Sequence, residues 1–230
     1  MREPKLSQLL AAAAALLLRP PDAVALAALA ETCGTDLDPD QARQDFYDVL
    51  CMPQSGRYVP PYAHALAKGT VRDGNWWHFP QPRYDGGDAL ASWYAAIGFE
   101  PARLDVDPML RGPHRPLDQA GFVLAYLAAL AEIGERDQSR RSTVDSIAGD
   151  FLGQNVGVWL DRFCNLLGGA GSYYLEAVAE AVEEAVNVAR ERYPAPIGER
   201  ASVERRPDAL QSACEGTPKQ GTIFCSLPRP

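Results

Sequence analysis

One stretch of the sequence, residues 117–133, is apolar on almost every side of the helix that it would form. Between Ala120 and Ala131 it holds only glycine, alanine, leucine, valine, phenylalanine and one tyrosine. A helix that is hydrophobic all round is stable in water only when other elements cover it. The stretch therefore predicts a buried central helix, and the rest of the chain has to supply its cover.

Seven further segments have the apolar spacing of amphipathic helices. They are residues 6–18, 22–31, 38–50, 88–97, 143–152, 155–167 and 172–192. Residues 172–192 place Tyr174, Val178 and Ala181 on an inward face, while Glu180 and Glu184 face water. No run of alternating β-branched residues predicts a strand. The fold class predicted is all-α, a single-domain helical bundle over residues 1–193.

Two segments lack a helical pattern. Residues 53–88 contain Pro60, Pro61, Pro80 and Pro82 with many aromatic side chains, which predicts a long aromatic and proline-rich crossover loop between helices. Residues 194–230 contain six prolines in 37 residues and few large apolar groups, which predicts an irregular, flexible tail. Cys214 and Cys225 lie in that tail without a metal-binding spacing.

The charge and the cysteines limit the classes of function. A net charge of −8 argues against a nucleic-acid partner and suits basic partners instead. Five scattered cysteines do not form a disulfide framework, which favours a reducing, cytoplasmic location. Residues 6–18 have the length of a signal peptide core, but they also trace one helical face. No other stretch is long and apolar enough for stable membrane insertion.

No motif predicts catalysis, a metal site or a cofactor. Asp36, Asp38 and Asp40 have the spacing that opens a calcium loop, but the rest of that loop is missing, and helix capping explains them better. The histidines and cysteines lack the spacing of ligands on one helix face. A metal-dependent enzyme that uses His64, His78, His114 and the cysteines therefore remains the least supported alternative.

Several stretches together resemble a known family. They are L-L-L-R-P-P-D-A-V-A-L-A-A-L-A at 16–30, D-F-Y-D-V-L-C-M-P at 45–53, Y-V-P-P-Y-A-H-A-L at 58–66, A-I-G-F-E-P at 96–101 and the P-L-D-Q turn at 116–119 before the long apolar helix. In this order they resemble the TorD/DmsD family of redox-enzyme maturation chaperones, which includes the NarJ-like nitrate reductase assembly proteins. Gln119 replaces a histidine of the family, Val123 a glutamate, and Ala63 and His64 a Glu-Ser pair.

The resemblance implies a chaperone rather than an enzyme. Its partners would be the immature catalytic subunit of a molybdenum oxidoreductase and the twin-arginine leader peptide of that subunit. The chaperone would hold both in the cytoplasm until the cofactor is inserted. It would be a monomer, or a dimer that exchanges elements through a loop such as residues 168–171. The alternative is a helical protein-interaction or ligand-sensing module that binds no leader peptide.

A leader peptide offers two arginines followed by an apolar run, so its receptor needs a hydrophobic groove beside carboxylates. The aromatic crossover predicts that groove, with Asp118 at its rim. The candidate binding residues are Pro60, Pro61, Tyr62, Trp76, Trp77, Phe79, Tyr84, Asp118 and Gln119. Two structural interpretations stay open, because Trp76 and Trp77 can simply anchor the loop and Asp118 can be a helix N-cap.

Overall fold

The computed structural model describes residues 4–67, 70–72, 76–78, 85–111 and 116–194. The candidate binding residues Phe79 and Tyr84, the histidine at position 114 and the predicted tail from residue 195 lie outside the described residues. The bounds given below refer to the described part of the chain.

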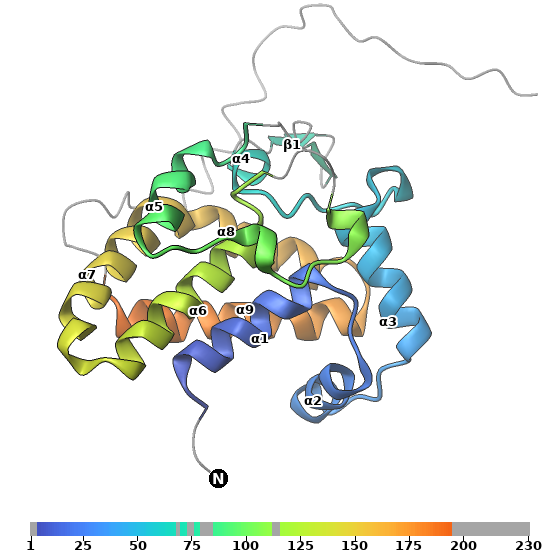
Figure 1. The fold of residues 1–230 in the computed structure, drawn as a ribbon. Coiled ribbons are helices and arrows are strands. Elements are labelled where there is room, and N and C mark those ends of the chain that lie inside the picture. Colours follow the sequence, from blue (N-terminus) through green and yellow to red (C-terminus); the bar gives the residue numbers. More distant parts are fainter. Residues whose placement is uncertain (1–3, 68–69, 73–75, 79–84, 112–115, 195–230) are drawn as a thin grey trace, which may run out of the picture. The chain divides into compact units, whose positions relative to one another are not determined.

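The described residues confirm the all-α class (Figure 1). The helices are α1 (Leu6–Leu18), α2 (Ala23–Cys33), α3 (Pro39–Phe46), α4 (Ala63–Leu66), α5 (Ala91–Ala96), α6 (Ala120–Arg136), α7 (Arg141–Phe151), α8 (Gly157–Gly168) and α9 (Tyr173–Arg192). Two π-helical segments, Tyr47–Cys51 and Leu152–Val156, continue α3 and α7. One short antiparallel hairpin joins β1 (Thr70–Arg72) to β2 (Trp76–His78).

Helix α6 is the predicted central helix. Its side chains Leu124, Tyr126, Leu127 and Leu130 are all 0% exposed. Figure 1 shows α6 between its neighbours, with α1 packed along it and α9 against α1 and α8. The helix begins at Ala120, three residues later than the pattern predicts, because the preceding residues hydrogen-bond to the crossover instead.

The structure confirms the helix capping predicted at Asp38, and Ser172 forms a second side-chain cap. Asp38 accepts a hydrogen bond from the backbone N–H of Gln41 at 2.8 Å, and Ser172 caps α9 through Leu175. The Gln41 side chain takes no part in this cap and donates to Asp45 instead. Capping thus explains Asp38 without a calcium loop.

The described parts of the crossover include regular structure that the sequence pattern did not predict. They contain α4 and the hairpin, in which Val71 pairs with Trp77 and Arg72 with Trp76. After the crossover, Asp88 begins a short 3₁₀ turn with Gly87 before it and forms no cap hydrogen bond.

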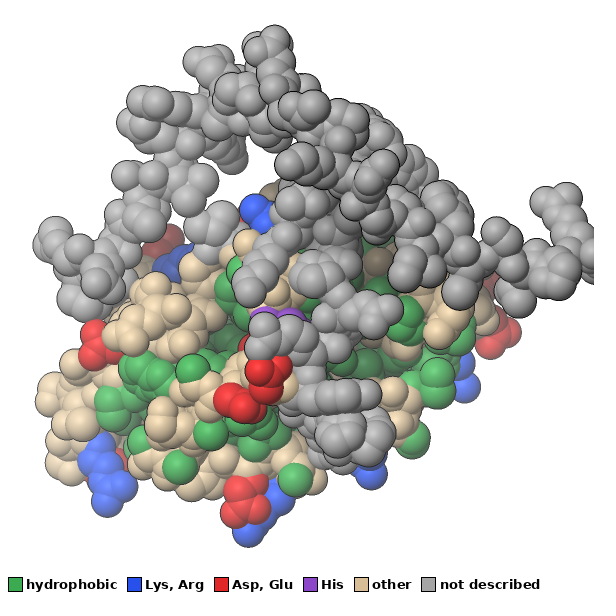
Figure 2. All heavy atoms as spheres, turned by 90° about the horizontal axis from the view of Figure 1, so that it is seen from above, with side chains coloured by type: hydrophobic (Ala, Val, Ile, Leu, Met, Phe, Trp, Pro, Cys, Tyr) green, Lys and Arg blue, Asp and Glu red, His purple; other side chains and the backbone are tan. Residues whose placement is uncertain are grey.

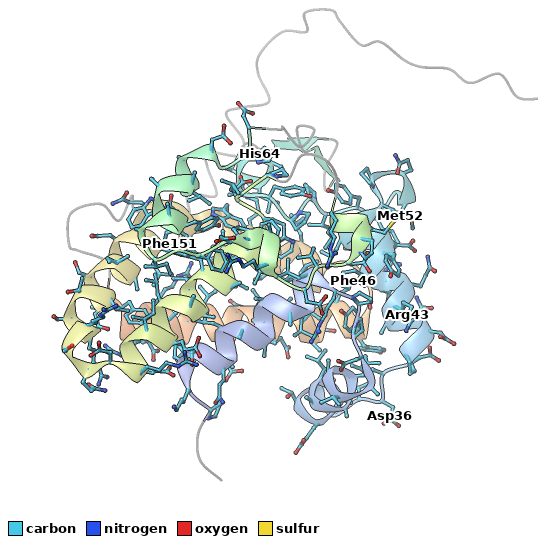
Figure 3. All side chains as sticks on the ribbon, in the orientation of Figure 1. Asp36, Arg43, Phe46, Met52, His64 and Phe151 are labelled. Atoms are coloured by element: carbon cyan, nitrogen blue, oxygen red, sulfur yellow. The ribbon has the colours of Figure 1, made fainter. Side chains whose placement is uncertain are left out.

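An aromatic cluster joins the crossover side of the bundle to its core. Tyr126 of α6 lies 5.1 Å from Tyr94 of α5 and 4.6 Å from Phe151 of α7, measured between ring centroids. Trp93 and Phe99 complete the cluster with edge-to-face contacts, a favourable aromatic geometry. Figure 3 shows Phe151 and Phe46 pointing into the bundle.

Across the described residues, no single helix is long and apolar enough to cross a bilayer. Helices α1 and α2 reach the required length only as a pair, and that pair is bent by 113°.

Candidate functional site

The crossover is pinned to the start of α6 by its proline pair. Pro61 is buried and its carbonyl accepts a hydrogen bond from the backbone N–H of Ala120 at 2.8 Å. The next backbone contact runs from the N–H of Ala63 to the carbonyl of Asp118 at 3.1 Å. Tyr62 and Gln119 thereby form an isolated antiparallel bridge. We call residues 60–64 and 117–120 the crossover junction.

Asp118 lies at the centre of the crossover junction and is 3% exposed. Its carboxylate accepts a hydrogen bond from the backbone N–H of His64 at 2.6 Å. The same carboxylate contacts Nδ1 of His64 at 2.8 and 3.0 Å, and the Tyr62 ring stacks on the imidazole at 5.7 Å. A free N–H in the first turn of a helix needs an acceptor, so Asp118 holds α4 in place from another part of the chain.

This placement corrects two expectations for Asp118. The side chain is not at a rim, because it is buried and turned toward His64. It is also not the N-cap of α6, a role that belongs to Gln119. The Oε1 of Gln119 accepts from Phe122 N at 3.0 Å, and its Nε2 donates to the carbonyl of Leu17 at 3.3 Å. The Asp118 side chain faces α4 and so does not cap α6. The Gln119 side chain is therefore left to cap α6 and to contact α1.

A third segment closes over the crossover junction. Leu117 donates its backbone N–H to Gly86 at 2.8 Å and accepts from the Tyr94 hydroxyl at 2.7 Å. Gly87 has φ +77°, and a Cβ on it would lie 2.4 Å from the backbone nitrogen of Asp118. Only glycine fits this approach, so residues 86–87 hold the end of the crossover against residues 117–118 of the crossover junction.

Burial keeps the phenol of the crossover junction neutral. Removal from water raises the pKa of Tyr62 to about 12, and the nearby Cys51 and Asp118 act in the same direction. Burial likewise raises the pKa of the Cys51 thiol to about 12, with Asp107 adding to the effect. A thiol with such a pKa is a weak nucleophile at neutral pH.

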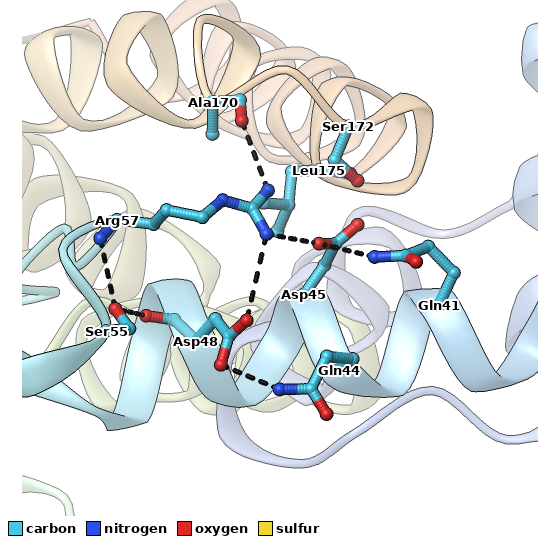
Figure 4. A network of polar contacts seen from close by, with 9 residues as sticks. All are labelled: Gln41, Gln44, Asp45, Asp48, Ser55, Arg57, Ala170, Ser172 and Leu175. Carbon is cyan, nitrogen blue, oxygen red and sulfur yellow. Dashed lines mark hydrogen bonds and ion pairs between the residues drawn. The ribbon is translucent and has the colours of Figure 1, made fainter.

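An ion pair between the half-exposed Arg57 and the buried Asp45 anchors the start of the crossover (Figure 4). Arg57 donates to Asp45 of α3 at 2.7 Å and to the carbonyl of Ala170, between α8 and α9, at 3.2 Å. Asp45 is 2% exposed. Burial alone would raise the pKa of Asp45, but hydrogen bonds from Ser172, Arg57 and Gln41 outweigh it and lower that pKa. In the sequence, Asp45 stands beside Phe46 on the apolar face of α3. A carboxylate on such a face requires a partner, and this is the signal that could have pointed to the ion pair.

The remaining candidate residues are placed only in part. The backbones of Trp76 and Trp77 lie in β2, within the hairpin that follows α4. Arg162 of α8 donates to the carbonyl of Leu66 and so fixes the end of α4 to the bundle. Seen from above in Figure 2, hydrophobic side chains reach the surface at several places, with acidic and basic side chains between them. The described residues contain no group of three His, Cys, Asp or Glu side chains that could hold a metal ion.

The structure thus has the all-helical fold class that the sequence pattern predicted, with the crossover held against its central helix. The chain belongs to the nitrate reductase delta subunit family, whose model matches residues 17–165. The family consists of NarJ/TorD-like maturation chaperones of molybdoenzymes and is not a family of catalysts. No curated protein matches the chain.

Proposed function

We propose that the chain binds the immature catalytic subunit of a molybdopterin-containing oxidoreductase, together with its twin-arginine leader, and holds both in the cytoplasm until the cofactor is inserted. The observation that carries the proposal is the family match over residues 17–165, which covers the whole crossover and α6. The acidic composition supports it as well, because a leader brings positive charge to its receptor.

The crossover is the proposed contact for the client subunit. An immature subunit exposes apolar surface, and aromatic side chains bind such surface with a large area at a small entropic cost. Trp76 and Trp77 are adjacent in β2, and the crossover junction holds the segment that leads to them against α6. Phe79 and Tyr84 follow in the sequence and are part of the same proposed contact.

The test uses the leader peptide and the large subunit of a molybdoenzyme encoded beside this chain. Calorimetry of the full chain with the leader should give a saturable complex, and a leader with both arginines changed to glutamine should bind at least tenfold more weakly. A tagged chain should also retain the large subunit from an extract of cells that lack the cofactor.

Trp77→Ala should weaken capture of the large subunit about tenfold, because a central aromatic contact is commonly worth 1–3 kcal/mol. Tyr173→Ala removes a side chain that is 70% exposed at the start of α9 and is the matched control. If neither leader nor subunit binds, the function is that of a different helical interaction or ligand-sensing module.

A further inference from the structure

A groove on another side of the bundle has the chemistry that a leader peptide requires. It has a volume of about 870 Å³ and is formed by α1, α2 and α9. Pro20 and Pro21 separate α1 from α2 and the two helices are bent by 113°, so each forms its own wall. Both helices contact α9, which closes the third side (Figure 1).

The walls of the groove are apolar and partly uncovered. Leu9, Ala12 and Leu16 line it from α1, and Ala28 and Leu29 from α2. Two of the four large hydrophobic side chains that are exposed within the described residues also line it. These are Val24, which is 79% exposed, and Val188, which is 37% exposed. Apolar side chains exposed from opposite walls of one groove indicate a surface for a partner.

The α9 wall carries a stripe of acidic side chains. Glu180, Glu183, Glu184 and Glu191 all line the groove and are exposed. The eleven-residue step from the first to the last corresponds to about 16 Å of helix at 1.5 Å per residue. We call these four residues the glutamate stripe.

Within the described residues, no basic side chain neutralises the glutamate stripe. The two arginines near the end of α9 pair elsewhere, Arg190 with Asp161 and Arg192 with Asp145, each at 2.9 Å. Arg19 is the one basic residue among those that line the groove, and it pairs with Asp105 at 2.9 Å. The groove therefore presents unneutralised negative charge along one side and apolar surface along the other two.

We propose that this groove is the docking site of the twin-arginine leader. The arginines bind the glutamate stripe, and the apolar run that follows them lies between α1 and α2. The inference rests on the proposed function and adds to it the surface and the carboxylates that recognise the leader. Asp118 cannot supply those carboxylates, because it is buried and bound to His64. Charge complementarity selects this occupant over a second copy of the acidic chain or an anionic membrane.

The test changes the two walls separately. The double variant Glu180→Lys with Glu184→Lys reverses charge on exposed residues and should weaken leader binding at least tenfold in calorimetry at low salt. Val24→Ser makes the apolar wall polar and should weaken it three- to tenfold with less dependence on salt. Asp40→Lys changes an exposed acidic residue of α3 outside the groove lining and should leave the dissociation constant within twofold. Circular dichroism verifies that each variant is folded.

A leader with both arginines changed to glutamate provides the reciprocal test. It should bind the Glu180→Lys, Glu184→Lys variant better than the unchanged chain, because the complementary charges are then exchanged. If the unchanged chain binds the normal leader but all of these variants bind it equally well, the groove is the wrong surface while the proposed function stands. If the unchanged chain binds no leader, the proposed function fails first. A concentration-dependent dimer that Val24→Ser abolishes in sedimentation would assign the groove to a second copy and overturn the proposal.

Discussion

Replacement of Asp118 by alanine separates a structural role for this residue from a role in peptide recognition. The variant removes the acceptor of two His64 groups, the backbone N–H at 2.6 Å and the ring Nδ1 at 2.8 Å. Each buried polar group left without a partner costs about 1–3 kcal/mol. The His64 side chain is 15% exposed, so water can satisfy the ring in part. We therefore expect a loss of about 3 kcal/mol in the free energy of unfolding.

The assay is thermal and urea unfolding of the purified chain. A loss of about 3 kcal/mol lowers the Tm of a domain of 150–250 residues by roughly 6–12 °C. Asp105→Ala is the control, because Asp105 forms its ion pair with Arg19 while 76% exposed, and such pairs contribute about 0–1 kcal/mol. A loss below about 1 kcal/mol for Asp118→Ala, combined with lost leader binding, would refute the structural role and restore Asp118 as a peptide contact.

Three further predictions concern the crossover junction and the core. Gly87→Ala should destabilise the chain by about 2 kcal/mol or more in urea unfolding, because φ is +77° and the added Cβ would lie 2.4 Å from Asp118 N. The control for this variant is Gly34→Ala, with φ +65° and no atom within 4 Å, which should cost only about 1 kcal/mol. Leu127→Ala, at a position that is 0% exposed in α6, should cost about 2–5 kcal/mol and still unfold in one transition. Tyr62 has its pKa raised to about 12 from the unfolded value of 10.0, so the unfolded chain loses its proton first and stability should fall as pH rises from about 10 to 12. Absorbance of tyrosinate at 295 nm and urea midpoints at each pH check the last prediction, and Tyr62→Phe should remove this contribution.

The helices could be predicted because their signals are local. The apolar run at 120–131, the cap at Asp38 and the glycine at 34 each act through residues within one or two turns. The start of α6 was predicted three residues too early for the opposite reason. Its first turn is decided by Pro61 and Ala63, which are more than fifty residues away, and no local pattern contains that contact.

The crossover junction shows the same limit at the level of single residues. Asp118 and Gln119 are neighbours and both can cap a helix, so the sequence cannot decide which of them does. The decision comes from His64, whose backbone N–H needs an acceptor at the start of α4. Once Asp118 satisfies it, Gln119 is the residue left to bind Phe122 N. Gln119, which replaces a histidine of the family, thus caps α6, a structural role that the family pattern did not assign to this position.

Neither the helix pattern of the sequence nor the family match could reveal the groove. The glutamates of α9 were correctly predicted to face water, but a helix pattern does not say what stands across from them. Ala181 was assigned to the inward face, whereas it is only half-buried and lines the groove. The family match ends at residue 165, before α9 begins, and starts at residue 17, after most of α1. Two of the three walls therefore lie largely outside the matched range, so the family match could not point to the groove.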